Sequence, residues 1–355
     1  MGDPRVNLHS TIWRVHVGTL ALSTTLIPIL KRAVFVAGKY SFRRQVTGSG
    51  QHPGPIIRFR TQQRPILRVL AQIAVYDRYA DASTALFQDR GMDYRVRHGV
   101  AAAFKAVLTQ GAQTSLFALS ERCGAQGLFE YNEIVESQLE ARGISIAEGD
   151  TMTLSISAYF DNAARVRLRL LTHVPYLGLA SELLLRKYSM PAPKDASCPL
   201  ARYEKHIFDV CRRYLWSFSG GHRSDECNAQ ILPHCQTLVE TIGHRMAYDA
   251  AREAAIEPNL LTLYEAGVLL QAPAWYVRGL RLDLEAQFQQ EARAIDSLLP
   301  RLNQLLDATG AAPYCSAPIL TNEAWNRFVD GLEGYGAEEG QWTACPGGSA
   351  VQSKL

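Results

Sequence analysis

The sequence is poor in the features that mark several classes of protein. Its 37 lysines and arginines nearly balance 34 aspartates and glutamates, which leaves a net charge of +3. A nucleic-acid-binding surface needs basic residues clustered on one face, so no nucleic-acid partner is expected. The most apolar stretch, residues 18–30, is about half as long as a bilayer requires and is followed by Lys31 and Arg32. It predicts a buried helix and not a membrane span.

Cysteine is scarce and irregularly spaced. There are 7 cysteines, an odd number, and none forms a CxxC pair. This usage favours reduced thiols in an intracellular protein. Cysteines and histidines gather between residues 211 and 244, but their spacings match none of the short ligand pairs of zinc sites. No metal site is therefore predicted.

The chain is rich in apolar residues at helical spacing. Of its 355 residues, 47% are hydrophobic, which is enough for a large core in one domain or two. Apolar residues recur at intervals of three and four nearly throughout, and no alternation of Val, Ile and Thr lasts long enough to build a sheet. The sequence therefore predicts an all-α fold.

Four long helices are expected in residues 1–190, where short connections favour a bundle. A proline at position 28 should bend the first helix. A loop rich in Gly and Pro is expected at residues 47–55, and an irregular stretch at 124–149. The expected helices cover residues 10–44, 60–87, 94–121 and a segment that begins near Asp150.

A proline-rich linker should separate this bundle from a second helical domain. Residues 191–199 contain three prolines and interrupt the helical pattern. The pattern resumes in residues 200–332, whose tryptophans and tyrosines fall among Leu and Val at helical spacing and are expected to pack in a core. The remaining residues, 333–355, are rich in Gly, Ser, Glu and Pro and read as a flexible tail.

The last three residues carry a targeting signal. Ser353, Lys354 and Leu355 form the peroxisomal import tripeptide, which a receptor reads at an accessible C-terminus. The tail before them supplies that access. Val6 stands where the myristoylation pattern needs Ser or Thr, and no secretory signal is evident. We therefore expect a peroxisomal protein that binds the import receptor.

Two polar segments are placed where they can meet a ligand. Arg43 and Arg44 end a helix and precede a glycine-rich loop, so they can clamp a phosphate or simply face the negative end of the helix dipole. In Glu121-Arg-Cys-Gly-Ala-Gln-Gly127, small residues allow a flat ligand to approach the backbone, yet the same residues suit an ordinary helix C-cap.

A third polar segment, Ile144-Ser-Ile-Ala-Glu-Gly-Asp150, brings a carboxylate to the start of the fourth helix. The carboxylate of Glu148 can interact favourably with the positive end of the helix dipole, or it can act as a general base if an apolar cleft tunes its pKa. Composition does not choose between these two interpretations.

The order and spacing of these segments resemble a known family. Tyr-x-x-Arg-Arg-Gln from Tyr40, Thr61-Gln-Gln, Cys-Gly-Ala-Gln-Gly from Cys123, and Ala-Glu-Gly-Asp from Ala147 are similar to the C-terminal half of acyl-CoA oxidases and, more distantly, acyl-CoA dehydrogenases. The resemblance continues in Leu263-Tyr-Glu-Ala-Gly-Val-Leu-Leu270 and in the pattern of Pro318, Ile319 and Trp325. It implies the dehydrogenase-like C-terminal four-helix bundle followed by the second helical domain of the oxidases.

The resemblance also assigns roles to residues. Glu148 matches the base that removes the α-proton of an acyl-CoA while a hydride leaves the β-carbon for N5 of FAD. Arg44 matches the arginine that contacts the pyrophosphate of FAD, and Gln63 matches the glutamine near the adenine half. A turn that lies against the cofactor is matched by Gly124, Ala125 and Gly127. In this family those contacts reach the FAD of the neighbouring subunit, which implies a dimer. Ala125 stands where the family usually has a second glycine.

The implied activity is FAD-dependent oxidation of an acyl-CoA to the trans-2-enoyl-CoA, with O₂ reduced to H₂O₂, in β-oxidation or fatty-acyl secondary metabolism. The family's N-terminal helical domain and middle β-domain would lie before Met1. The chain is therefore expected to form a homodimer, or a heteromer with an N-terminal half or a full-length oxidase. One alternative is a non-catalytic subunit that docks on a full-length oxidase, and a more distant one is an unrelated helical adaptor in peroxisomes.

Overall fold

The computed structural model describes residues 13–47, 53–157, 183, 188–217 and 225–332. Within them the regular secondary structure is helical apart from one antiparallel pair of two-residue strands, which confirms the all-α prediction. The first-half elements are α2 (Trp13–Thr24), α3 (Leu26–Arg43), β1 (Gln45–Val46), β2 (Gly54–Pro55), η1 (Ile56–Arg58), α4 (Arg60–Gln88), α5 (Tyr94–Arg122), η2 (Gly124–Leu128), η3 (Glu130–Asn132), α6 (Ile134–Ile146) and α7 (Thr151–Ser157).

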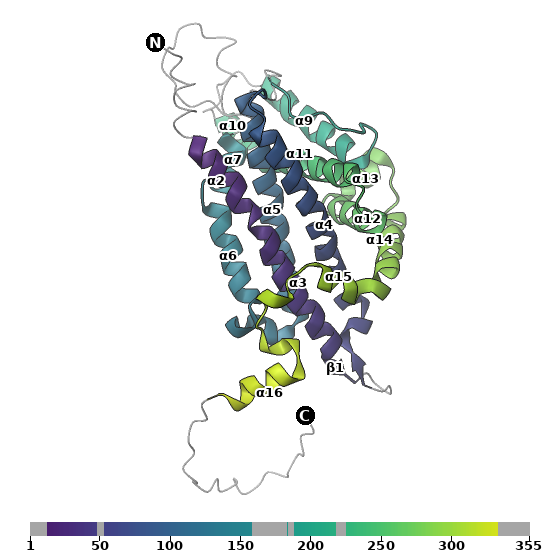
Figure 1. The fold of residues 1–355 in the computed structure, drawn as a ribbon. Helices are drawn as coiled ribbons and strands as arrows, with labels where there is room; N and C mark the ends of the chain where they lie inside the picture. Colours follow the sequence, from purple (N-terminus) through teal and green to yellow (C-terminus); the bar gives the residue numbers. More distant parts are fainter. Residues whose placement is uncertain (1–12, 48–52, 158–182, 184–187, 218–224, 333–355) are drawn as a thin grey trace, which may run out of the picture.

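The second half contains α9 (Pro199–Ser217), α10 (Asp225–Gln230), α11 (Leu232–Glu253), α12 (Pro258–Leu269), α13 (Pro273–Leu280), α14 (Leu284–Leu298), η5 (Leu299–Arg301), α15 (Leu302–Ala308), η6 (Ala312–Tyr314), η7 (Pro318–Leu320) and α16 (Asn322–Asp330). Figure 1 shows α9 and α11–α14 along one side of the bundle, while α15 and α16 return to the end of α3. The division into two domains at residues 191–199 stays a prediction.

The first helix is interrupted one turn before its proline. Pro28 has no N–H to donate to the carbonyl of Thr24, and its ring would crowd that carbonyl. The helix accordingly breaks at Thr25, whose N–H bonds to the carbonyl of Leu22 at 3.1 Å. This interruption, close to the proline, separates α2 from α3.

By length and composition alone, Trp13–Arg43 could cross a membrane, and no other helix among the described residues could. In the structure 61% of its apolar window is buried. It packs against α4, α5 and α6, which is the environment of a core helix. Leu26, Leu30 and Val34 are fully buried there, as the spacing of the apolar residues predicts.

The two longest helices form the centre of the bundle. α4 and α5 begin at the predicted residues and end one residue beyond the predicted ends. Ala101, Ala103 and Ala106 on α5 are almost completely buried, because their small side chains let neighbouring helices approach closely. The carboxylate of Asp93 caps α5 by accepting a hydrogen bond from the N–H of Arg95 at 2.9 Å.

The prediction of an irregular stretch at residues 124–149 is wrong. This stretch contains α6, a helix of 13 residues that packs on α5 and α3. Its pattern is weak because few of its apolar residues face the core: Ile134 and Ala141 are buried, whereas Leu139 is exposed. The fourth predicted helix does start next to Asp150, as α7, but its continuation beyond residue 157 lies outside the described residues.

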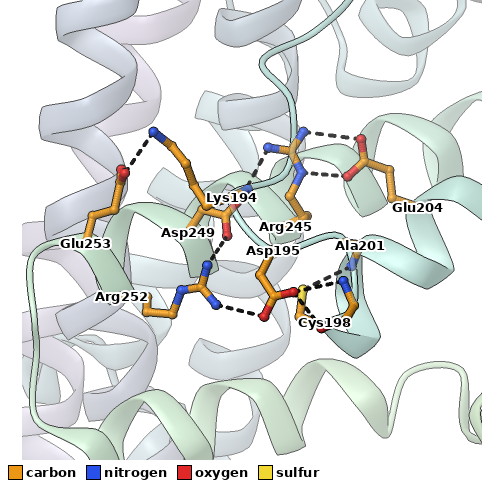
Figure 2. A network of polar contacts seen from close by, with 10 residues as sticks. Lys194, Asp195, Cys198, Ala201, Glu204, Arg245, Asp249, Arg252 and Glu253 are labelled. Carbon is orange, nitrogen blue, oxygen red and sulfur yellow. Dashed lines mark hydrogen bonds and ion pairs between the residues drawn. The ribbon is translucent and has the colours of Figure 1, made fainter.

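A buried cluster of charges attaches the segment at residues 191–199 and α9 to α11 (Figure 2). Arg245 is only 2% exposed and donates to Glu204 at 2.6 Å and to the carbonyl of Pro191 at 2.8 Å. Asp249 lies 3.6 Å from the same guanidinium and accepts from the N–H of Lys194 at 3.1 Å. Because the charges are paired with one another, the cluster can remain buried between these elements.

Candidate functional site

The end of α3, the start of α4 and the end of α5 enclose a cavity of about 760 Å³. Strand β1 and the turn after α5 complete its rim, and α16 covers one side with Asn322 and Trp325. Among the described cysteines, Cys123 lines this cavity. Burial raises the pKa of its thiol to about 12, so it remains a neutral wall residue and not a thiolate.

Two adjacent arginines in the cavity have different surroundings. Arg43 donates to Oδ1 of Asn322 at 3.0 Å, and burial lowers the pKa of its guanidinium from the usual value. Arg44 is exposed, and its side chain makes no hydrogen bond or ion pair with any part of the chain that the structure describes. Its backbone is fixed, because its N–H bonds to Tyr40 and its carbonyl accepts from Ile56, both at 2.8 Å. Arg44 is therefore held in place with its charge available.

The turn after α5 presents small residues to the same cavity. Gly124 has a φ of +59° and nothing within 4 Å of the place where a Cβ would stand, and Ala125 beside it is exposed. Gly127 is buried and does not line the cavity. Instead, its carbonyl accepts from the hydroxyl of Ser120 at 2.9 Å. Gly127 thus anchors the turn on α5, while Gly124 and Ala125 face the open space.

The two neighbouring glutamines separate into different environments. Gln62 lines the cavity and donates to the carbonyl of Arg122 at 2.5 Å and to the hydroxyl of Ser41 at 3.2 Å. Gln63 is turned inward and donates to the carbonyl of Ile57 at 2.9 Å, which supports the short helix η1. Its contact with the adenine half of a cofactor stays a prediction.

Glu148 lies in another part of the bundle. It is half-buried between α6 and α7, with a left-handed backbone at φ +56° and its side chain against Gly18 of α2. The carbonyls on either side of it bind Lys105, and 17 residues of α5 separate Lys105 from Arg122 at the cavity. At about 1.5 Å per residue this is roughly 25 Å along the helix. Within one copy of the chain, Glu148 therefore does not border the cavity, and its role as the base stays a prediction.

The sequence did not single out several residues that line the cavity. Gln62 and Arg122 lie inside two of the motifs quoted above, but the motifs gave them no role. Asn322 and Trp325 follow the arginines by about 280 residues, and only the return of α16 to the end of α3 brings them there. The targeting tripeptide Ser353, Lys354 and Leu355 lies outside the described residues.

No cluster of three or more His, Cys, Asp or Glu that could hold a metal occurs among the residues that the structure describes. Five described cysteines, at positions 123, 198, 211, 235 and 315, are free thiols.

Comparison with known proteins identifies the class. Residues 15–159 match the family model of the acyl-CoA oxidase C-alpha1 domain. The chain therefore carries a C-alpha1 domain of the acyl-CoA oxidases and has the fold of the C-terminal half of those proteins, as the resemblance in the sequence predicts. A search of curated proteins found no match.

Solved structures of acyl-CoA oxidases share this fold. Acyl-CoA oxidase 1 of Arabidopsis thaliana superposes with a TM-score of 0.70 at 15% identity, over 93% of this chain and 55% of its own. Acyl-CoA oxidase-1 of Caenorhabditis elegans, complexed with FAD and ATP, gives 0.68 at 17% identity, over 90% and 54%. Acyl-CoA oxidase-2 of the same organism, bound with FAD, ascaroside-CoA and ATP, gives 0.68 at 16%, over 92% and 54%. The chain spans about half the length of these relatives.

Proposed function

We propose that the chain is a component of an acyl-CoA oxidase that holds part of FAD in the cavity at the end of α3 and supplies Glu148 as the base. The observation that carries this proposal is Arg44, an arginine fixed by its backbone at the cavity rim with no described partner for its charge. A guanidinium in this setting suits a diphosphate, to which it can make charge-assisted hydrogen bonds.

The cavity also has the shape and polarity that a flavin dinucleotide needs. Arg43 adds positive charge, and its Nε is buried without a hydrogen-bond partner among the described atoms. The turn at Gly124 and Ala125 leaves open space for a flat group to approach the backbone. Of the two neighbouring glutamines, Gln62 and not Gln63 lines this space, so we assign to Gln62 the contact for which the resemblance suggested Gln63. Two C. elegans relatives of the same fold are complexed with FAD.

Glu148 is suited to accept the α-proton of an acyl-CoA. Its half-buried position against Gly18 limits the access of water, which would compete for the same proton. A bound FAD would supply the acceptor for the hydride from the β-carbon, and O₂ would be the final acceptor of the two electrons, with H₂O₂ as the product. The product is the trans-2-enoyl-CoA, in β-oxidation or in fatty-acyl secondary metabolism.

The separation of Glu148 from the cavity favours an assembly of two chains. Within one copy, roughly 25 Å of α5 lies between them. In the proposed complex each flavin binds in the cavity of one subunit and lies next to Glu148 of another. The second subunit is a further copy of this chain or a longer acyl-CoA oxidase, and Ser353, Lys354 and Leu355 direct the complex to the peroxisome.

The same separation also favours a second candidate function. A chain whose base and cofactor cavity do not meet can serve as a non-catalytic subunit that docks on a full-length oxidase and stabilises it. In that case FAD binding in the complex would depend on Arg44, whereas turnover would not depend on Glu148.

One reconstitution experiment tests both candidates. The full chain is purified alone and with an acyl-CoA oxidase partner from the same source, and the flavin spectrum and H₂O₂ release are recorded with hexanoyl-CoA and palmitoyl-CoA. We expect little FAD on the chain alone and turnover in the complex. Glu148→Gln should abolish turnover while FAD stays bound. Normal turnover by this variant would remove Glu148 from the mechanism and leave the non-catalytic subunit, and a complex that binds no FAD would contradict both.

A further inference from the structure

Lys105 is a buried lysine in the middle of α5, only 1% exposed. Its ammonium group donates to the carbonyl of Ala147 at 2.5 Å and to the carbonyl of Gly149 at 2.6 Å. A lysine is rarely buried so completely unless its charge is compensated. Here burial lowers the pKa of Lys105, and the carboxylates of Asp150 and Glu148 oppose that effect.

The two carbonyls that Lys105 binds flank Glu148. The third carbonyl of this turn, that of Glu148 itself, lies 3.2 Å from the hydroxyl of Thr19, whose single proton is shared with the closer carbonyl of Val15 at 2.9 Å. Lys105 therefore makes the two short bonds of this turn, one on each side of Glu148. A backbone segment held on both sides of one residue has little freedom to change its direction.

This turn needs such ties because its backbone is unusual. Glu148 has a φ of +56°, a left-handed conformation that is unfavourable for a residue with a Cβ, and Gly149 follows at +102°. Non-glycine residues keep this conformation only where the surroundings impose it. In the described structure Lys105 makes the shortest of the bonds that impose it.

The direction of the backbone decides where the carboxylate lies. The side chain of Glu148 passes so close to α2 that a Cβ on Gly18 would stand 2.6 Å from its Cδ and 2.7 Å from its Oε1. If the turn relaxed to a right-handed conformation, the side chain would leave this position. The place of the carboxylate is thus linked to the backbone direction of this turn, which the bonds of Lys105 help to fix.

We propose that Lys105 is a positioning residue that holds the carboxylate of Glu148 in the geometry required for proton abstraction. The proposal rests on the role of Glu148 in the proposed function. The simpler interpretation is that Lys105 only caps the C-terminus of α6, whose last carbonyls attract a positive charge. The two interpretations predict different results for a variant that lacks the Lys105 amine but keeps the fold. A positioning role predicts a loss of catalysis, and a capping role does not.

The test compares Lys105→Met, which keeps the length of the side chain and removes its donors, with Lys105→Arg, which keeps charge and donors. Lys31→Met is the matched control, because Lys31 is paired at the surface of the bundle with Asp77 at 2.9 Å. The first readout is amide hydrogen exchange of residues 146–151 in the full chain. The second is kcat and KM of the reconstituted complex with palmitoyl-CoA.

We expect Lys105→Met to raise exchange in this segment at least tenfold and to lower kcat at least tenfold, with KM within twofold of the wild type. Lys105→Arg should keep both the exchange rate and kcat close to the wild-type values, and Lys31→Met should change neither quantity. Unchanged exchange, or faster exchange with unchanged kcat, would overturn the proposal. If the wild-type complex shows no turnover, the proposed function fails, and the exchange data alone decide whether Lys105 sets the turn. Should Lys105→Met not fold, Lys105→Gln replaces it with the same readouts.

Discussion

The carbonyl oxygen of Ser120 lies 2.1 Å from the point where a Cβ on Gly127 would stand. The hydroxyl of the same serine donates to the carbonyl of Gly127 at 2.9 Å. The turn after α5 therefore folds back onto the last turn of that helix without room for a single methyl group. This close approach is what directs Gly124 and Ala125 toward the cavity.

Gly127→Ala is expected to destabilise the chain and displace this turn. The obstructing atom belongs to the backbone of α5 and cannot move aside, so the free energy of unfolding should fall by about 2 to 4 kcal/mol. Gly143→Ala is the matched control, because nothing lies within 4 Å of a Cβ at that helical position. It should stabilise the chain by about 0.5 to 1 kcal/mol. Urea unfolding of both variants measures the difference, and equal stabilities would contradict the described approach.

Arg44→Gln is expected to weaken FAD binding by the complex and to leave the fold unchanged. A hydrogen bond to a charged group contributes about 1.5 to 3 kcal/mol, which corresponds to a loss of affinity of roughly ten- to a hundredfold. Arg58→Gln is the control, since Arg58 is nearby but does not line the cavity and lies 5.0 Å from the ring of Phe59. Flavin fluorescence titration gives both affinities. Equal affinities for the two variants would place the cofactor elsewhere.

The sequence predicts the parts of the fold that depend on local pattern. α4 and α5 are long, with apolar residues at helical spacing, and their starts were predicted at the observed residues. The sequence does not predict α6, because only a few of its apolar residues are buried and the apolar spacing is therefore weak. The helix depends on its contacts with α5 and α3. Local signals of this kind are weak whenever tertiary contacts supply most of the stability of a helix.

The residues of the candidate site likewise divide into those that local motifs predict and those that only the packing of distant helices brings together. Arg44 and Gly124 could be chosen from motifs, because a helix end and a glycine turn are local features. The cover that Trp325 provides could not, because it depends on where a distant helix packs. The distance between Glu148 and the cavity was also inaccessible, since it depends on the alignment of α6 and α7 along α5.

Acid should destabilise the chain through His244, on α11. Burial lowers the pKa of His244 from its usual value to about 4, and its Nδ1 lies 2.9 Å from the hydroxyl of Tyr264 on α12. Between pH about 6.5 and 4 the unfolded chain therefore binds a proton at His244 that the folded chain does not. The contribution of this histidine to stability is complete above pH about 6.5 and is lost as the pH falls toward 4, by about 2 to 3 kcal/mol.

The comparison of wild type with His244→Asn isolates this contribution from that of the carboxylates. Asparagine can also hydrogen-bond to Tyr264 but does not titrate, so its curve of unfolding free energy against pH should be flatter by about 2 kcal/mol between pH 7 and 4.5. His234→Asn, at an exposed position on the same helix, should keep the slope of the wild type. Urea unfolding at intervals of half a pH unit provides the curves. Parallel curves for wild type and His244→Asn would mean that His244 is protonated in the folded chain, and the contact between α11 and α12 would then have to accommodate an imidazolium.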